Sequence, residues 1–180
     1  MQVSYQATVS GWHDFFILGG TASATLVGLL FVGLSLHLRI VIASSEVRSL
    51  ARVTLANFGT ILFVALFMVI PQDQSTAALQ LVASGVASLA IATPSLVTAA
   101  QSGGRTLQMR RRDRARLILR FGLSAAGYVA VIVAGILLFS SVTSAFAWLV
   151  VAILVLLIVS LRNTWDLLVS VGDITLGSSA

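Results

Sequence analysis

The sequence predicts an all-α integral membrane protein with five transmembrane helices, the N-terminus outside and the C-terminus inside. Of its 180 residues, 58% are hydrophobic and only 9% are charged, and the mean hydropathy is +1.02. Soluble domains carry roughly 25% charged residues, so this chain has too few charged side chains to form a water-exposed surface. Long apolar runs recur along the whole chain, and seven of the eleven Arg gather between two of them, at residues 105–120. We therefore treat residues 1–180 as a single membrane domain.

Five apolar runs are each long enough for the ~30 Å hydrocarbon core of a bilayer. The helices expected from them span about 15–38, 53–70, 77–100, 121–139 and 145–171. Pro94 is expected to kink the third helix near its inner end, because proline removes one backbone hydrogen bond. The strictly apolar part of the fifth run ends at Leu161, but helix-compatible sequence continues to Val171. This pattern predicts one continuous fifth helix that projects beyond the membrane.

Arginine is distributed unevenly among the connections between these runs. The polar N-terminal residues 1–13 and the connections 71–76 and 140–144 contain none. In contrast, the first connection contains three arginines, Arg39, Arg48 and Arg52. Positive charge close to helix ends stays in the cytoplasm during insertion. The distribution therefore predicts an outer N-terminus and an inner C-terminus.

The connection 101–116 is expected to be an Arg-rich cytoplasmic loop. Six of its residues are candidates for contact with anionic lipid: Arg105, Arg110, Arg111, Arg112, Arg114 and Arg116. Near a membrane surface, each basic residue of such a cluster contributes roughly 1 kcal/mol of attraction to acidic headgroups. The alternative is a topology signal with no further role. A net charge of +5 on so apolar a chain favours a membrane surface as the partner, and nucleic acid is not expected.

Polar and small residues follow one face of the first predicted helix. The pore-lining candidates on this face, at helical spacings, are Asp14, Thr21, Thr25, Gly28 and Ser35. One interpretation is that the hydroxyls bond their own helix and simply face the interior of the bundle. Another is a pore in which the hydroxyls replace water around a passing ion. A third is contact with a ligand or partner.

Small residues at four-residue spacing predict close helix packing. The candidates are Gly20 and Ala24 in the first helix, and Gly122, Ala126 and Ala130 in the fourth. In lipid, such grooves drive helix association because they let two backbones approach closely. The spacing does not say whether the partner helix belongs to the same chain or to a second copy. The third helix has a similar stripe at Ser84, Ser88 and Ala92, and three such grooves in five helices favour a homo-oligomer.

No catalytic, metal or cofactor site is predicted, and the chain is not expected to be an enzyme. His13 and His37 lie at opposite ends of one helix and cannot bind one metal within a chain. There is no cysteine, no HExxH motif and no Gly-rich phosphate loop. Asn57, about one turn into the second predicted helix, is expected to hydrogen-bond a neighbouring helix.

Three segments resemble a known group of proteins. They are WHDFFILGG at Trp12–Gly20, GLLFVGLSLHL at Gly28–Leu38 and NTWDLLV at Asn163–Val169. Together they resemble small multi-pass membrane proteins of unknown function from actinobacteria, some of which are labelled as modulators of the FtsH protease. The resemblance implies location in the bacterial cytoplasmic membrane, and it implies no functional residue.

Two functions remain open at this point. The first is a homo-oligomeric, cation-permeable channel or pore lined by the first helix. The alternative is a regulatory or adaptor protein that docks a partner through the Arg-rich loop and the fifth helix. The expected partners are the lipid bilayer, its anionic lipids and further copies of the chain.

Overall fold

The computed structural model describes residues 2–105, 111–140 and 144–177. In these ranges the chain forms six helices: α1 (Gln2–Leu36), α2 (Leu38–Ala43), α3 (Ser45–Val69), α4 (Gln74–Arg105), α5 (Arg111–Phe139) and α6 (Ala145–Gly177). All except the short α2 contain a stretch that is long and apolar enough to cross a membrane. The prediction of an all-helical chain with five membrane-length helices is thereby confirmed.

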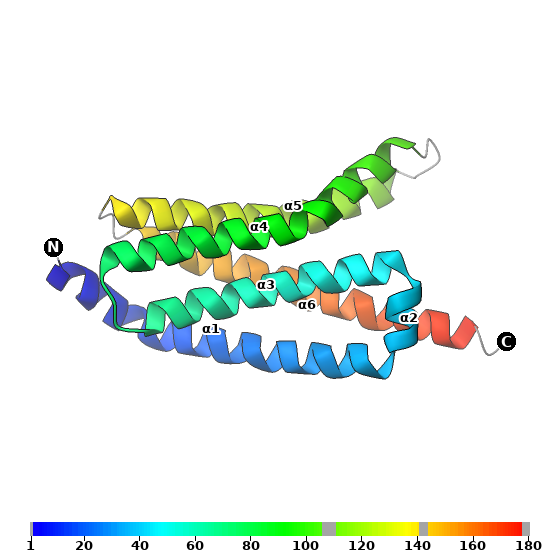
Figure 1. Ribbon diagram of the computed structural model, residues 1–180, viewed down its shortest axis with the longest axis horizontal. Coiled ribbons are helices and arrows are strands. Elements are labelled where there is room, and N and C mark those ends of the chain that lie inside the picture. The colour runs from blue at the N-terminus through cyan, green and yellow to red at the C-terminus, as the bar shows by residue number, and fades with distance from the viewer. Residues whose placement is uncertain (1, 106–110, 141–143, 178–180) are drawn as a thin grey trace.

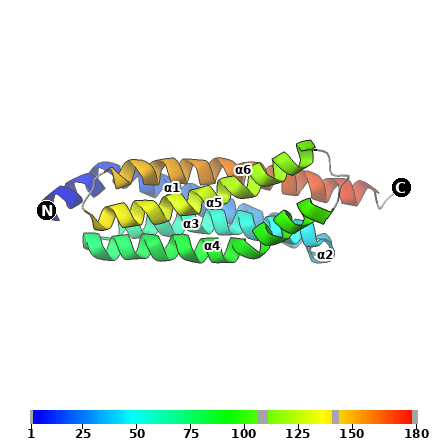
Figure 2. The same ribbon diagram turned by 90° about the horizontal axis from the view of Figure 1, so that it is seen from above.

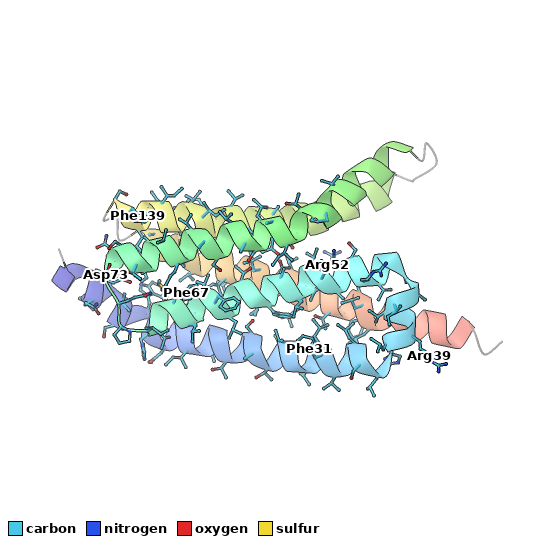
Figure 3. All side chains as sticks on the ribbon, in the orientation of Figure 1. Phe31, Arg39, Arg52, Phe67, Asp73 and Phe139 are labelled. Atoms are coloured by element: carbon cyan, nitrogen blue, oxygen red, sulfur yellow. The ribbon has the colours of Figure 1, made fainter. Side chains whose placement is uncertain are left out.

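The long helices run side by side as an elongated bundle, with the two termini at opposite ends (Figure 1). Five successive antiparallel helices place the termini in this way. Asp73 and Phe139 lie at the end nearer the N-terminus, whereas Arg52 and Arg39 lie toward the other end (Figure 3). We call these the Asp73 end and the Arg39 end. The charge difference between the two ends matches the one that motivated the topology prediction.

Helix α3 organises the packing because it contacts α1, α4 and α6, while α5 packs against α4 and α6. Figure 2 shows the bundle from above, with α4 and α5 lying along one another. The core consists of apolar side chains such as Phe16, Phe58 and Phe146, all of which are fully buried. Helix α1 is peripheral: it packs mainly against α3, and most of its surface remains exposed.

The α4–α5 contact is close because glycine removes the side chain at the crossing. A Cβ atom on Gly85 would lie 2.6 Å from Ile132 Cγ1, and one on Gly135 would lie 2.8 Å from Val82 Cγ2. Such distances leave no room for a larger residue. On another face of α5, a Cβ on Gly127 would lie 2.6 Å from Leu156 Cδ2 of α6.

Several helix bounds differ from the expected ones. Helix α1 begins at Gln2 rather than near residue 15, because Tyr5 is buried and packs against Phe146 of α6, with ring centroids 6.2 Å apart. This tertiary contact stabilises a polar segment that lacks helical periodicity of its own. The turn at His37 and α2 follow, within the first connection.

The Arg-rich connection is more helical than expected. Instead of a loop over residues 101–116, α4 continues to Arg105 and α5 already begins at Arg111. Helix α4 also continues through Pro94 and bends away from α3 toward its C-terminal end (Figure 1), as a proline in a helix predicts. The fifth long helix is continuous through Asn163 and ends at Gly177, so the prediction of one unbroken helix is confirmed.

Candidate functional site

The polar face of α1 lies on the outside of the single bundle. All five pore-lining candidates, Asp14, Thr21, Thr25, Gly28 and Ser35, are exposed. The interpretation that this face packs inside the same bundle does not hold. The reason is that α1 contacts α3 through its opposite face.

That opposite face is held by close contacts with α3. A Cβ atom on Gly20 would lie 3.0 Å from Ala65 Cβ, and Ser23 Oγ donates a hydrogen bond of 2.7 Å to the Phe58 carbonyl oxygen. Ser23 is fully buried. These contacts fix the rotation of α1 about its axis, and the rotation turns the polar face outward.

The Thr25 and Ser35 hydroxyls on the exposed face bond their own helix. Thr25 Oγ1 donates to the Thr21 carbonyl oxygen at 2.9 Å, and Ser35 Oγ donates to the Val32 carbonyl oxygen at 2.8 Å. Each hydroxyl thus uses its single proton within α1, while its oxygen retains acceptor capacity. The face can therefore present oxygen atoms to a cation or to a neighbouring chain.

Asp14 lies at the Asp73 end of this face and also lines a pocket of about 480 Å³. The pocket lies between the N-terminal part of α1 and the α3–α4 connection, and His13 and Tyr5 contribute to its wall. Gln6 Nε2 closes one side by donating to the Gln72 carbonyl oxygen at 3.2 Å. Asp14 is thus an exposed carboxylate at the end of the polar face nearest Asp73.

Asp73 in the neighbouring connection is the N-cap of α4. Its carboxylate accepts hydrogen bonds from the Thr76 backbone N–H at 3.0 Å, the Thr76 hydroxyl at 2.7 Å and the Ser75 hydroxyl. These bonds, the Ser75 hydroxyl first among them, lower the pKa of Asp73. The carboxylate is therefore ionised at neutral pH and is engaged in helix capping.

A buried polar cluster joins α3 to α5. Asn57 Nδ2 donates to Ser124 Oγ at 3.1 Å, and Tyr128 OH donates to Asn57 Oδ1 at 2.5 Å. All three residues are 1% exposed or less, so neither lipid nor water competes for these bonds. The prediction that Asn57 bonds a neighbouring helix is confirmed. The sequence did not identify Ser124 and Tyr128 as the partners of Asn57. The feature that could have indicated them is the spacing of their two polar side chains, one helical turn apart.

A second polar contact joins α3 to α4. Thr60 Oγ1 lies 2.6 Å from Ser88 Oγ, and Ser88 donates to the Ser84 carbonyl oxygen at 2.8 Å. Both polar contacts satisfy side chains that hydrocarbon would leave without partners. They hold helices together, and neither contains a nucleophile paired with a base.

The small-residue candidates fall into two groups. Gly20 is buried against α3, and Ala130 is half-buried. Ala24, Gly122 and Ala126 are exposed on the single chain. The exposed members do not pack within the chain, so any close packing through them involves a second copy or lipid.

A groove with a volume of about 590 Å³ runs between α3 and α4, and Val27 of α1 also lines it. Its wall is almost entirely apolar and includes Leu55, Gly59 and Phe63 of α3 and Ala83, Ala87 and Ile91 of α4. Arg52 lies in the wall at the end where α4 bends away (Figures 1 and 3). Sequence analysis did not predict this groove, because it depends on how the two helices are placed.

Five of the six candidate lipid contacts lie at the tips of α4 and α5. Arg105 ends α4, Arg111, Arg112, Arg114 and Arg116 belong to the first turns of α5, and Arg110 lies outside the described residues. Their contact with anionic lipid stays a prediction.

Within the described ranges, no three His, Asp or Glu side chains come together in a way that could hold a metal ion. The fold and its exposed polar face define an all-helical chain of multi-pass membrane type. No family model, curated protein or solved structure matches this chain.

Proposed function

We propose that this chain forms a homo-oligomer in the bacterial cytoplasmic membrane, in which α1 helices from neighbouring copies surround a cation-permeable path. The observation that supports this proposal is the exposed polar face of α1, from Asp14 to Ser35, which no part of the described chain covers. In the proposed oligomer, the α1 helices of neighbouring copies cover this face.

Physical chemistry disfavours leaving this face against lipid. Hydrocarbon offers no partners to the outward oxygen atoms of Thr21, Thr25 and Ser35. Ala24 and Gly28 leave a shallow surface, and a Cβ on Gly28 would meet nothing within 4 Å. Small residues of this kind allow another helix to approach closely. Self-association through α1 therefore removes a costly surface from lipid.

The charge along the face favours cations. Asp14 stands at one mouth, where a ring of carboxylates from several copies would raise the local cation concentration. Between Asp14 and Ser35 the face contains only uncharged side chains. Arg39 lies beyond the other end, in α2, where its long side chain reaches lipid phosphates rather than the path.

The test is ion-current recording from purified protein in planar bilayers. Asp14→Asn should lower the cation preference, and Thr25→Leu should lower the conductance because it narrows the path and removes an oxygen atom. Asp73→Asn and Thr93→Leu are the matched controls. Asp73 lies at the same end of the bundle, and exposed Thr93 also donates to its own helix, at the Leu89 carbonyl oxygen.

Equal effects of the control substitutions and the α1 substitutions would contradict the proposal. So would the absence of current from the unmodified protein across voltage, pH and membrane tension.

One observation favours the second candidate, an adaptor protein. The adjoining ends of α4 and α5 bend away from the other helices (Figure 1), and α6 continues as helix to Gly177 although its membrane-length stretch ends at Val169. These helical ends offer a docking surface outside the bilayer. Silent recordings, together with partner capture that depends on Arg111 and Arg112, would support this function in place of the pore.

A further inference from the structure

The groove between α3 and α4 has the properties of a lipid-binding site. It lies along two membrane-length helices, and its wall is almost entirely apolar. Small residues form much of that wall, among them Ala56, Gly59 and Ala87. A Cβ on Gly59 would meet nothing within 4 Å, so no protein side chain fills the space beside it. In a bilayer, lipid hydrocarbon is the material that fills such a space.

Arg52 makes one end of the groove positively charged, whereas the rest of the wall is almost entirely apolar. It is the only charged residue among the described residues that line the groove, and it is exposed. Helix α4 contains Pro94 and bends away from α3 toward this end (Figure 1). A guanidinium at the mouth of an apolar groove complements a molecule with an anionic group attached to a hydrocarbon chain.

We propose that this groove binds an acidic phospholipid from the leaflet at the Arg39 end of the bundle. The lipid phosphate pairs with Arg52, and one acyl chain lies along Leu55, Gly59 and Phe63 on one side and Ala87 and Ile91 on the other. This site is separate from the Arg-rich tips of α4 and α5, and it does not depend on the proposed pore.

The part of the groove assigned to the acyl chain agrees with one leaflet. From Arg52 to Phe63 this part extends about 16 Å along α3, which is about half of the ~30 Å hydrocarbon core. Beyond that reach, Gln80 Oε1 and Ser84 Oγ are buried in the groove wall, and neither has a hydrogen-bond partner in the described part of the chain. Hydrocarbon is unfavourable beside such atoms, so the acyl chain ends before them.

The experiment uses photoactivatable lipids in nanodiscs that contain the full-length protein. Phosphatidylglycerol and phosphatidylcholine, each with a diazirine in one acyl chain, are added in trace amounts to a phosphatidylcholine bilayer, and adducts are mapped by peptide mass spectrometry. Adducts from phosphatidylglycerol on residues 55–63 and 87–91 should exceed those from phosphatidylcholine about fivefold, as one well-placed Arg implies.

Two pairs of variants separate the headgroup from the tail. Arg52→Gln should abolish the fivefold excess, whereas Arg48→Gln, which changes an exposed Arg of α3 outside the groove, should preserve it. Gly59→Leu should fill the groove and remove the adducts. Gly122→Leu should leave them unchanged, because a Cβ on this exposed glycine of α5 also meets nothing within 4 Å. Ala87→Leu fills the opposite wall and replaces Gly59→Leu if that variant does not purify as a folded protein.

Three results would overturn the proposal. Equal labelling by the two lipids would remove the role of the headgroup. Equal losses in Arg52→Gln and Arg48→Gln would indicate diffuse attraction to the basic end of the bundle. Undiminished adducts in both folded groove-filling variants would show that the acyl chain lies elsewhere.

Discussion

Asn57 has a different role from Thr25 and Ser35 of α1, although α3 and α1 are both membrane-length helices. Its amide accepts from Tyr128 and donates to Ser124, and all three side chains are buried. An amide satisfied from both sides by another helix fixes the position of α3 against α5. The hydroxyls of Thr25 and Ser35 in α1 instead bond their own backbone and are exposed. The difference separates a residue that stabilises the bundle from residues available to a second molecule.

Substitution of Asn57 by Leu is expected to destabilise the bundle by about 1–2 kcal/mol. It leaves the Tyr128 hydroxyl buried without its acceptor, and hydrogen bonds between membrane helices contribute about 0.6 kcal/mol on average and up to about 1.7 kcal/mol. Tyr128→Phe removes the hydroxyl that lacks an acceptor in Asn57→Leu. The double variant Asn57→Leu/Tyr128→Phe should therefore lose less stability than the sum of the losses in the two single variants. Reversible unfolding in detergent micelles measures the four free energies. Strictly additive losses would contradict this coupling.

At the scale of the helices, the rotation of each helix about its own axis decides what its small residues do. In α5, Gly127 and Gly135 make the close contacts with α6 and α4. Gly122 and Ala126 belong to a stripe with the expected four-residue spacing, yet both are exposed. Adjacent positions in a helix differ by about 100°, so Ala126 and Gly127 face different surroundings. The stripe at the surface is left for contacts outside the chain.

Gly135→Leu and Gly122→Leu test this assignment as a matched pair within α5. A Cβ on Gly135 would lie 2.8 Å from Val82 Cγ2 and 3.0 Å from the Ala78 carbonyl oxygen, so a larger side chain must push α4 and α5 apart. We expect a loss of about 1–3 kcal/mol or more for Gly135→Leu. Gly122→Leu should change the stability of the single bundle little. Unfolding of monomeric protein in detergent gives both values, and similar losses in the two variants would refute the assignment.

At the scale of the whole molecule, the described arginines all lie toward one end of the bundle, so the two ends differ in net charge. Asp14 and Asp73 belong to one end, and Arg39 and Arg52 lie toward the other (Figure 3). The termini also lie at opposite ends (Figure 1). If five helices cross the bilayer, the positive end should be cytoplasmic. Both the proposed pore, with its outer carboxylates, and the proposed inner-leaflet lipid site use this orientation.

Cysteine labelling can test the orientation directly, because the chain contains no cysteine of its own. A cysteine introduced at Ser75, which is exposed in the structure, should react with a membrane-impermeant maleimide in intact cells. A cysteine at Gln108, which lies outside the described residues, should react only after the membrane is permeabilised. Labelling of position 108 in intact cells would reverse the orientation and would place the Arg52 lipid site in the outer leaflet.

Composition and periodicity determined the class of this protein. A chain so apolar and so poor in charge predicts helices of membrane length, and the spacing of its apolar runs is a local property that the sequence displays directly. The interhelical role of Asn57 was also predictable, since an amide in hydrocarbon needs a partner. The extension of α1 to Gln2 was not, because it depends on the contact between Tyr5 and Phe146, which are far apart in the sequence.

Only the tertiary structure decided which faces of the helices are covered. Four-residue spacing identifies a stripe on a helix, but the stripe points inward or outward according to how neighbouring helices pack, as Gly20 and Gly122 show. The same holds for the polar face of α1, which the contacts of Gly20 and Ser23 with α3 turn outward. The groove beside Arg52 likewise exists only because α3 and α4 are placed together with small residues between them. These features depend on the relative rotation and spacing of whole helices, which are set by contacts between residues far apart in the chain.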